Sequence, residues 1–178
     1  MKMEELEKLQ QANFAFFERL FGGRTPAVTF IILIFQVLHI YDDLVDQDRP
    51  PSTDDIHKCF WIALLELPLD PFFRKHEAIL RPILMNSILN WRVANEIENS
   101  KEQDKRHLGV AWILRAAYLD LLSLSLALER GVDYSISAGQ LLRDWAHAET
   151  FESYLTNLEN EKAARNGKSR RITDRTDP

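Results

Sequence analysis

The aspartates at positions 42, 43 and 46 are the residues of this chain best suited to chemistry. They lie in the string VLHIYDDLVDQDRP, directly after the most apolar run of the sequence. On a helix, side chains three and four residues apart share a face, so Asp42 and Asp43 can both approach Asp46. Like charges held together repel unless a cation, an arginine or water compensates them. Because Mg²⁺ prefers carboxylate oxygens and keeps positions free for phosphate oxygens, the pattern predicts a magnesium and phosphate site.

The same string resembles the aspartate-rich DDxxD motif of the all-helical isoprenoid synthases, the prenyl transferases and terpene cyclases. Its residues 42–46, DDLVD, match the motif and, as in that family, end a long apolar helix just after a histidine, His39. The resemblance implies that Asp42 and Asp46 bind Mg²⁺ ions that hold a substrate diphosphate, with Asp43 in support. Arg49 alone stands where the prenyl transferases usually carry an arginine pair.

A second segment resembles the other metal-binding element of the terpene cyclases. Asn90 and Glu98 have the spacing of that element, and Ala94 replaces its hydroxyl ligand. The resemblance implies that Asn90 and Glu98 are ligands from a second helix. Arg49 and Arg92 are expected to contact the phosphate group. The resemblance is confined to these two segments, and the chain has no second DDxxD motif.

The aspartates also have two structural interpretations. They could pair with arginines such as Arg92 or Arg115, or they could form a solvated end that stops the apolar helix. The helix dipole disfavours negative charge at a carboxyl terminus, so we expect a compensating partner.

His39 and Asp120 are expected to be structural polar residues. Asp120 lies within the apolar string AAYLDLLSLSLAL on a stripe of small residues. A carboxylate there is costly unless it is hydrogen-bonded, for example to His39, Tyr41 or Arg115. A metal-ligand role for Asp120 is the alternative.

Helical spacing of apolar residues, with Gly and Pro at the ends, predicts a bundle of about six helices. We expect one all-α domain over residues 1–166 and a disordered polar tail over 167–178. The apolar run from Ala27 to Tyr41 is expected to be a buried central helix, and the four tryptophans are expected to pack in the core. The predicted helices cover residues 4–21, 26–48, 52–68, 70–99 with a break or kink at Pro82, 101–130, and from Ser135 or Ser137 to 166.

Composition limits the classes of partner and compartment. A formal net charge of −5 gives no basic field for a phosphate backbone, so nucleic-acid binding is not expected. The sole cysteine, Cys59, cannot form an internal disulfide, and together with a polar amino terminus it indicates a cytoplasmic protein. The run from Ala27 to Tyr41 is short for a membrane span and is bounded by charges, so no span is expected.

Two functions remain open on the sequence. The first is a small helical protein that binds Mg²⁺ and, through it, a phosphorylated or diphosphate small molecule, as a reduced isoprenoid-synthase-like enzyme would. The second is a non-catalytic helical protein that binds a partner or forms a homo-oligomer, with an incidental or degenerate acidic motif.

Overall fold

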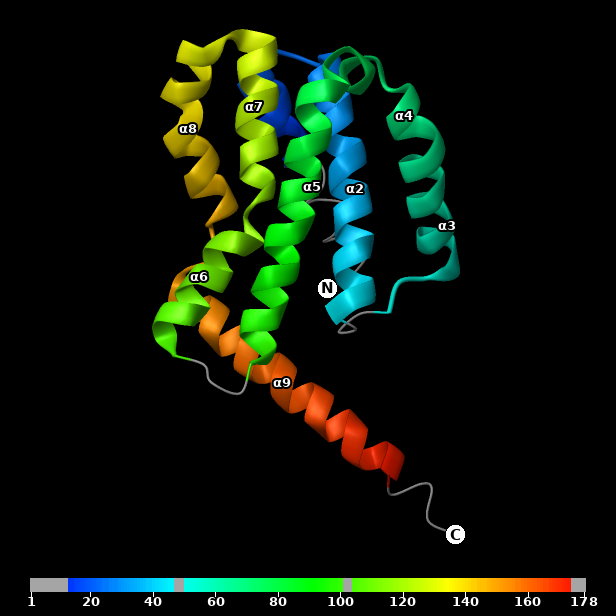
Figure 1. Cartoon of the computed structure of the whole chain (residues 1–178), viewed down its shortest axis with the longest axis vertical. Coiled ribbons are helices and arrows are strands. Elements are labelled where there is room, and N and C mark those ends of the chain that lie inside the picture. The colour runs from blue at the N-terminus through cyan, green and yellow to red at the C-terminus, as the bar shows by residue number, and fades with distance from the viewer. Residues whose placement is uncertain (1–12, 47–49, 101–103, 174–178) are drawn as a thin grey trace. The chain divides into compact units, whose positions relative to one another are not determined.

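The computed structural model describes residues 13–46, 50–100 and 104–173 of the chain (Figure 1). Every element in these ranges is helical, which confirms the predicted all-α class. A first helix covers residues 13–21. The following elements are α2 (Pro26–Asp46), α3 (Thr53–Trp61), the π-helix η1 (Ile62–Glu66), α4 (Leu67–Leu69), α5 (Pro71–Asn99), α6 (Lys105–Arg115), α7 (Tyr118–Arg130), α8 (Val132–Ala146) and α9 (Phe151–Thr173).

Several helix ends lie where the sequence predicts them. The first helix stops at Gly22, whose φ of 79° is the left-handed conformation that glycine adopts without strain. Ser52 caps α3 in a capping box: the Ser52 hydroxyl accepts a hydrogen bond from the Asp55 N–H, and the Asp55 carboxylate accepts one from the Ser52 N–H. Asp70 caps α5 by accepting from the Phe73 N–H over 2.8 Å.

Two predicted long helices are each divided. The helix expected over 101–130 breaks between α6 and α7, where Ala116 has φ −91° and ψ 19°. The helix expected to end at 166 is split into α8 and α9, and the Thr150 hydroxyl accepts from the Ser153 N–H at the new start. Neither break carries a proline or a glycine, so the usual sequence signals of a helix end are missing there.

The remaining differences concern α5 and the carboxyl terminus. Pro82 lies inside α5, and the non-helical residue is His76 (φ −119°, ψ 15°). The turn that Pro82 crowds begins at Ala78, four residues before it, and His76 lies two residues further back. The break or kink predicted at Pro82 is therefore wrong in position, and the proline does not account for the distortion at His76. Helix α9 continues to Thr173, past the predicted start of the tail at 167; residues 174–178 lie outside the described residues.

Contacts between residues divide the chain into two compact units. The first comprises residues 1–84 and 120–140. Its core is aromatic: the Phe30 ring on α2 lies 5.6 Å from Phe72 and 5.9 Å from Phe73 on α5. The first half of α2 is buried as expected, but its second half, from Phe35 onward, is only partly covered and His39 is exposed. The predicted burial on all sides is therefore wrong for that half.

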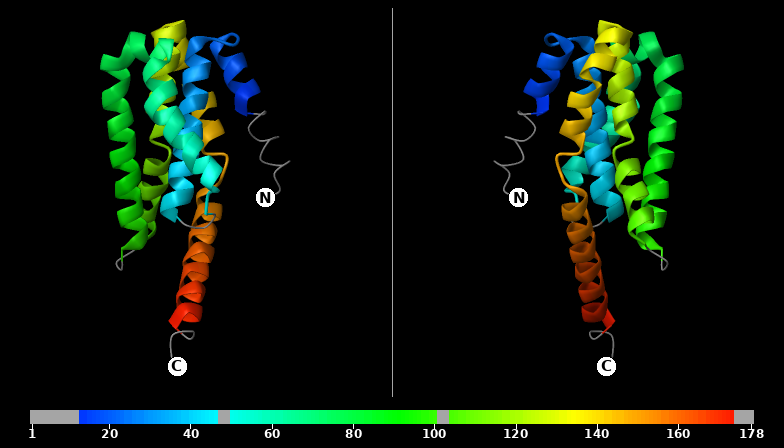
Figure 2. Two further views of the ribbon diagram at one scale, coloured as in Figure 1. Left: turned by 90° about the vertical axis from the view of Figure 1, so that its right-hand side faces the viewer. Right: turned by 90° about the vertical axis from the view of Figure 1, so that its left-hand side faces the viewer.

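Within the first unit, α3, η1 and α4 form one continuous helical rod. Its backbone stays right-handed helical through both junctions, at Ile62 and Leu67. The rod packs along α2 through α3, η1 and α4 alike, as Figure 1 and the side views of Figure 2 show. One face of the rod meets α2, and the large apolar side chains on the other face are exposed among the described residues of this unit.

The second unit comprises residues 85–119 and 141–178, and so holds the second half of α5 together with α6 and α9. The Ser87 hydroxyl of α5 donates to the Ala117 carbonyl over 3.2 Å, at the break after α6. The Trp112 ring of α6 lies 5.6 Å from Phe151 at the start of α9. These contacts fix α6 between α5 and α9.

Candidate functional site

The acidic motif lies on the last turns of α2. Asp42 and Asp43 are half-buried there and neither is without a partner. The Asp43 carboxylate is 17% exposed and lies 3.8 Å from the His39 ring, one turn earlier. The side chain of Asp46 and the whole of Arg49 lie outside the described residues.

The described residues do not complete a metal centre. Among them, no group of three or more His, Cys, Asp or Glu side chains is arranged to hold an ion. Because the Asp46 side chain is not among them, the triad of Asp42, Asp43 and Asp46 stays a prediction. Asp42 and Asp43 supply the carboxylate oxygens that Mg²⁺ prefers.

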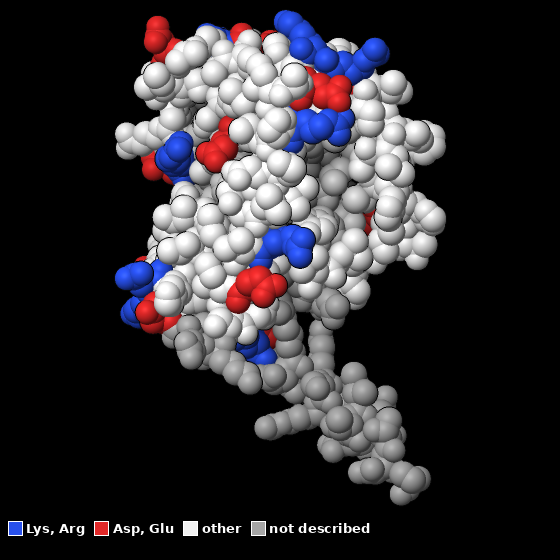
Figure 3. Space-filling model, in the orientation of Figure 1, with Lys and Arg blue, Asp and Glu red and all other residues white. Residues whose placement is uncertain are grey.

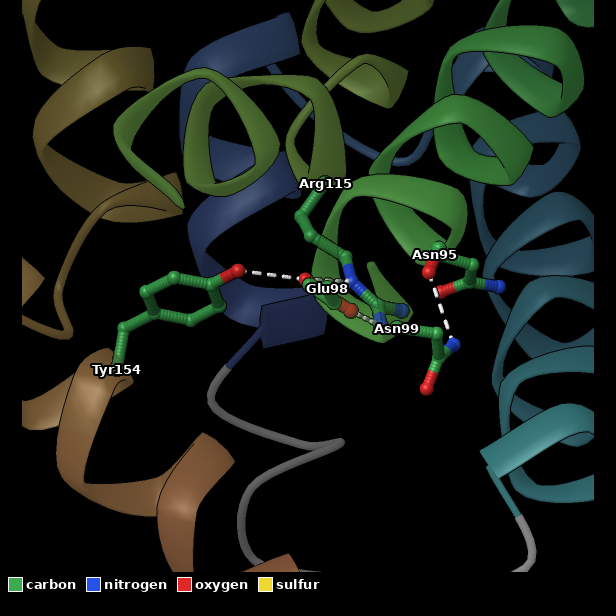
Figure 4. Close-up of polar contacts among 5 residues, drawn as sticks. All are labelled: Asn95, Glu98, Asn99, Arg115 and Tyr154. Atoms are coloured by element: carbon green, nitrogen blue, oxygen red, sulfur yellow. Dashed lines mark hydrogen bonds and ion pairs between the residues drawn. The ribbon is translucent and has the colours of Figure 1, made fainter. Parts of the chain in front are cut away.

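Glu98, predicted as a metal ligand, instead lies in a buried network in the second unit (Figure 4). Its side chain is 4% exposed. Arg115 of α6 donates from Nε to Oε1 over 3.0 Å and from Nη2 to Oε2 over 2.5 Å. Tyr154 of α9 donates its hydroxyl to Oε1 over 2.6 Å. A cation at Glu98 would have to displace the guanidinium, so the geometry does not fit the predicted ligand role.

The surroundings of the network explain its strength. Burial, together with the hydrogen bond to Glu98, raises the pKa of Tyr154, so its hydroxyl keeps its proton and remains a donor. The Arg115 guanidinium also lies 4.8 Å above the Trp91 ring, a cation–π contact. Charge, hydrogen bonds and ring packing thus join α5, α6 and α9. Both Glu98 oxygens accept hydrogen bonds from these side chains, so the described contacts give the network a structural role.

One polar atom near this network lacks a partner among the described residues. The buried Asn95 Oδ1 on α5 accepts no hydrogen bond there. Asn99, one turn later, donates to the Asn95 backbone carbonyl over 2.8 Å and leaves the side chain unused. Asn95 is a residue that sequence reasoning missed, because a single asparagine in an amphipathic helix gives no signal of its burial.

The other predicted site residues are divided between the two units. Asn90 is half-buried and Arg92 exposed, both on the part of α5 that belongs to the second unit. The acidic motif belongs to the first unit. The two predicted metal-binding elements therefore belong to different units.

Asp120 corrects a prediction. It is exposed in the first turn of α7 rather than buried in an apolar stripe. The break at Ala116 starts a new helix just before Asp120, and a carboxylate is favoured at a helix amino terminus. Arg115, one of the residues considered as a partner of Asp120, forms an ion pair with Glu98.

A surface that sequence reasoning missed is the outer face of the rod in the first unit. Trp61, expected in the core, is 59% exposed there. Phe60 and Leu64 are four positions apart, as are Trp61, Leu65 and Leu69 in succession, and residues with this spacing share a helix face. Five exposed apolar residues on this face are together called the α3–α4 stripe: Phe60, Trp61, Leu64, Leu65 and Leu69.

The sequence of the rod does indicate the α3–α4 stripe, because apolar residues occur on both of its faces. The inner face of the rod already has its own apolar residues, including the buried Ile62. A helix that is apolar on both faces needs two partners, and α2 covers only one face. On the face that Figure 3 shows, the region of α3 and α4 at the right has few charged atoms.

Two stretches, Pro26–Val45 and Lys105–Arg130, are long and apolar enough to cross a membrane by length and composition, and most of each apolar segment is not buried. The core helix of a soluble protein passes the same test, so the expected absence of a span stays a prediction. No protein-family model, curated protein or solved structure matches this chain.

Proposed function

We propose that this chain is a helical interaction protein that self-associates through the α3–α4 stripe. The observation that carries the proposal is the exposure of large apolar side chains on one face of a single rod, with Leu64 at 66% and Leu69 at 69%. Contiguous exposed apolar surface of this kind marks interaction sites in soluble proteins. The rod also contains a π-helix, a feature that is frequent at functional positions.

A second copy of the chain fits this surface. In a two-fold symmetric interface the same patch must be complementary to itself. Antiparallel pairing centred between Leu64 and Leu65 sets Phe60 of each copy against Leu69 of the other. It also sets Trp61 against the exposed Pro68. Each large ring then meets a smaller side chain, which favours interdigitation.

The charges at the two ends of the rod match the same pairing. Asp54 and Asp55 are exposed at its beginning, and Arg74 and Lys75 are exposed in the first turns of α5, just past its end. Antiparallel pairing brings the acidic end of one copy to the basic end of the other, twice. Charges at the rim of an interface add little affinity but select orientation. They therefore favour the antiparallel pair.

The mass of the protein in solution tests the proposal. Sedimentation velocity over a concentration series is expected to show a dimer for the natural chain and a monomer for Leu64→Glu/Leu65→Glu. Both positions are exposed, so the substitution leaves the fold intact, which circular dichroism checks. The matched control is Ile136→Glu at an exposed apolar position on α8; it is expected to remain dimeric. A monomeric natural chain, or a natural chain that instead sediments with phospholipid vesicles, would contradict self-association.

A second candidate is cation binding at the acidic motif. Its support is the position of Asp42 and Asp43, half-buried at the carboxyl end of α2, where the helix dipole disfavours carboxylates. A ligand that binds only the folded state raises its stability. Thermal melting with Mg²⁺ or Mn²⁺, alone and with pyrophosphate, is therefore expected to show a higher melting temperature. No shift at millimolar metal with pyrophosphate would remove this candidate.

A further inference from the structure

An apolar pocket of about 430 Å³ lies in the second unit, between α6 and the first turn of α9. Its walls include Val110 and Ile113, both more than 40% exposed, and Phe151. The Trp112 ring forms a further wall and is held by His147, 4.6 Å away, and by Phe151. The pocket is a shallow depression that is open to solvent, and its floor is formed by one face of α6 and the Phe151 ring.

A glycine keeps this pocket open. Gly109 lines it in the middle of α6, where glycine costs about 1 kcal/mol of helix stability relative to alanine. A Cβ at this position would lie 3.8 Å from Phe151 Cζ, an ordinary contact. A longer side chain at Gly109 would extend into the space and fill it.

The charge at the pocket is positive. Arg106 is the only charged residue among those that line it within the described chain. Lys105 and Arg106 are both exposed in the first turn of α6, where the helix dipole adds positive potential. The nearby carboxylate of Asp104 accepts from the His107 N–H over 2.7 Å and lies 3.2 Å from the His107 ring. A ligand here therefore meets an apolar wall with one guanidinium at its edge.

We propose that this pocket binds a small alkyl carboxylate. The alkyl chain lies against Trp112, Ile113 and Phe151, and the carboxylate accepts hydrogen bonds from the Arg106 guanidinium, whose donor geometry matches a carboxylate. A neutral alkyl compound gains only the apolar part of this binding, and an alkyl cation is repelled. The proposal is independent of the α3–α4 stripe, which lies in the other unit.

Titration with octanoate tests the site, with octanol and octyltrimethylammonium as neutral and cationic probes of the same chain. Binding is measured by calorimetry, and the indole N–H signal of Trp112 by nuclear magnetic resonance. Octanoate is expected to bind most tightly and to shift the Trp112 signal. Arg106→Gln is expected to weaken octanoate about three- to fivefold, the range of an exposed ion pair, and to leave octanol unchanged. Arg143→Gln, at an exposed arginine of α8, is the matched control and changes neither.

One filling variant, with a matched control, tests the pocket itself. Gly109→Leu is expected to abolish binding of octanoate and octanol, whereas Gly139→Leu, in open space on α8, is expected to keep both. If Gly109→Leu does not fold, Ile113→Asn replaces an exposed apolar wall of the pocket with a polar one and is expected to abolish binding of both probes without touching the core. Equal affinity for all three probes, or binding that survives Gly109→Leu or Ile113→Asn, would overturn the proposal. Sedimentation with anionic phospholipid vesicles in place of octanoate binding would overturn it as well.

Discussion

Tyr154 donates a hydrogen bond to Glu98 Oε1 over 2.6 Å, joining α9 to α5 across 56 positions of the sequence. The same carboxylate pairs with Arg115 of α6. Three helices of the second unit are thus held by one buried charge.

Removing that charge is expected to destabilise the protein strongly. Glu98→Gln leaves the Arg115 guanidinium, 22% exposed, without its counter-ion. Breaking a buried pair in this way costs about 3 kcal/mol or more. The free energy of unfolding is measured by urea denaturation. Glu96→Gln, at an exposed position of the same helix, serves as control and is expected to change stability by less than about 0.5 kcal/mol. Equal effects of the two substitutions would show that the network contributes nothing.

The stability of the protein is expected to fall at high pH because of Tyr154. Its pKa is raised in the folded state, so the protonated hydroxyl stabilises the fold fully below the unfolded pKa of about 10. The contribution is lost as the pH rises above that value. Tyr154→Phe removes a hydrogen bond to a charged group, about 1.5 to 3 kcal/mol at neutral pH, and should flatten the alkaline loss. Burial also raises the pKa of Tyr118, to about 12, so the comparison must be with the natural chain at each pH. An unchanged alkaline slope in Tyr154→Phe would contradict the assignment.

Two glycines are expected to respond in opposite directions to alanine. Gly22 has φ 79°, and a Cβ there would also meet the Arg130 guanidinium, which binds the Phe21 carbonyl. Gly22→Ala should therefore destabilise by about 1 kcal/mol or more. Gly139 lies inside α8 in open space, so Gly139→Ala should stabilise by about 0.5 to 1 kcal/mol. Thermal melting of both variants measures the two changes in stability. A change of the same sign in both variants would contradict the assigned backbone conformations.

Local signals predicted much of the fold. Ser52, Asp70 and Gly131 mark helix ends by hydrogen bonding or by a left-handed φ, which depend on neighbouring residues only. Pro26 begins α2 for the same kind of reason, since its missing N–H is not needed there. The all-α class followed from these signals and from helical periodicity.

The parts that sequence reasoning could not predict depend on tertiary contacts. Glu98 and Arg115 are 17 positions apart, and no local pattern selects Arg115 as the partner of Glu98 rather than of Asp42. Trp61 looks like a core residue because it is large and apolar. Its residue type does not show which face of the rod meets α2, so its exposure could not be predicted. The exposure of Asp120 follows from a helix break that no glycine or proline announces.

The acidic motif makes a prediction about the sign of a stability change. If Asp42 and Asp46 form a cation site, they repel each other in the absence of metal, and Asp42→Asn/Asp46→Asn should stabilise the metal-free protein by a few tenths to about 1 kcal/mol. The same variant should abolish any melting shift with Mg²⁺. If the aspartates are instead paired with buried arginines, the variant loses about 3 kcal/mol or more. Urea denaturation with and without Mg²⁺ separates the two cases, and a destabilised variant whose parent ignores metal would exclude cation binding.

Self-association through the α3–α4 stripe is tested most directly by a charge exchange between two copies. Antiparallel pairing sets Asp54 of one copy at the same end as Lys75 of the other. Asp54→Lys alone and Lys75→Glu alone are each expected to weaken the dimer at low salt, because like charges then meet at both ends. An equimolar mixture of the two variants is expected to restore a dimer that contains one copy of each, as measured by native mass spectrometry and sedimentation velocity. A mixture that associates no more tightly than either variant alone would contradict antiparallel self-association.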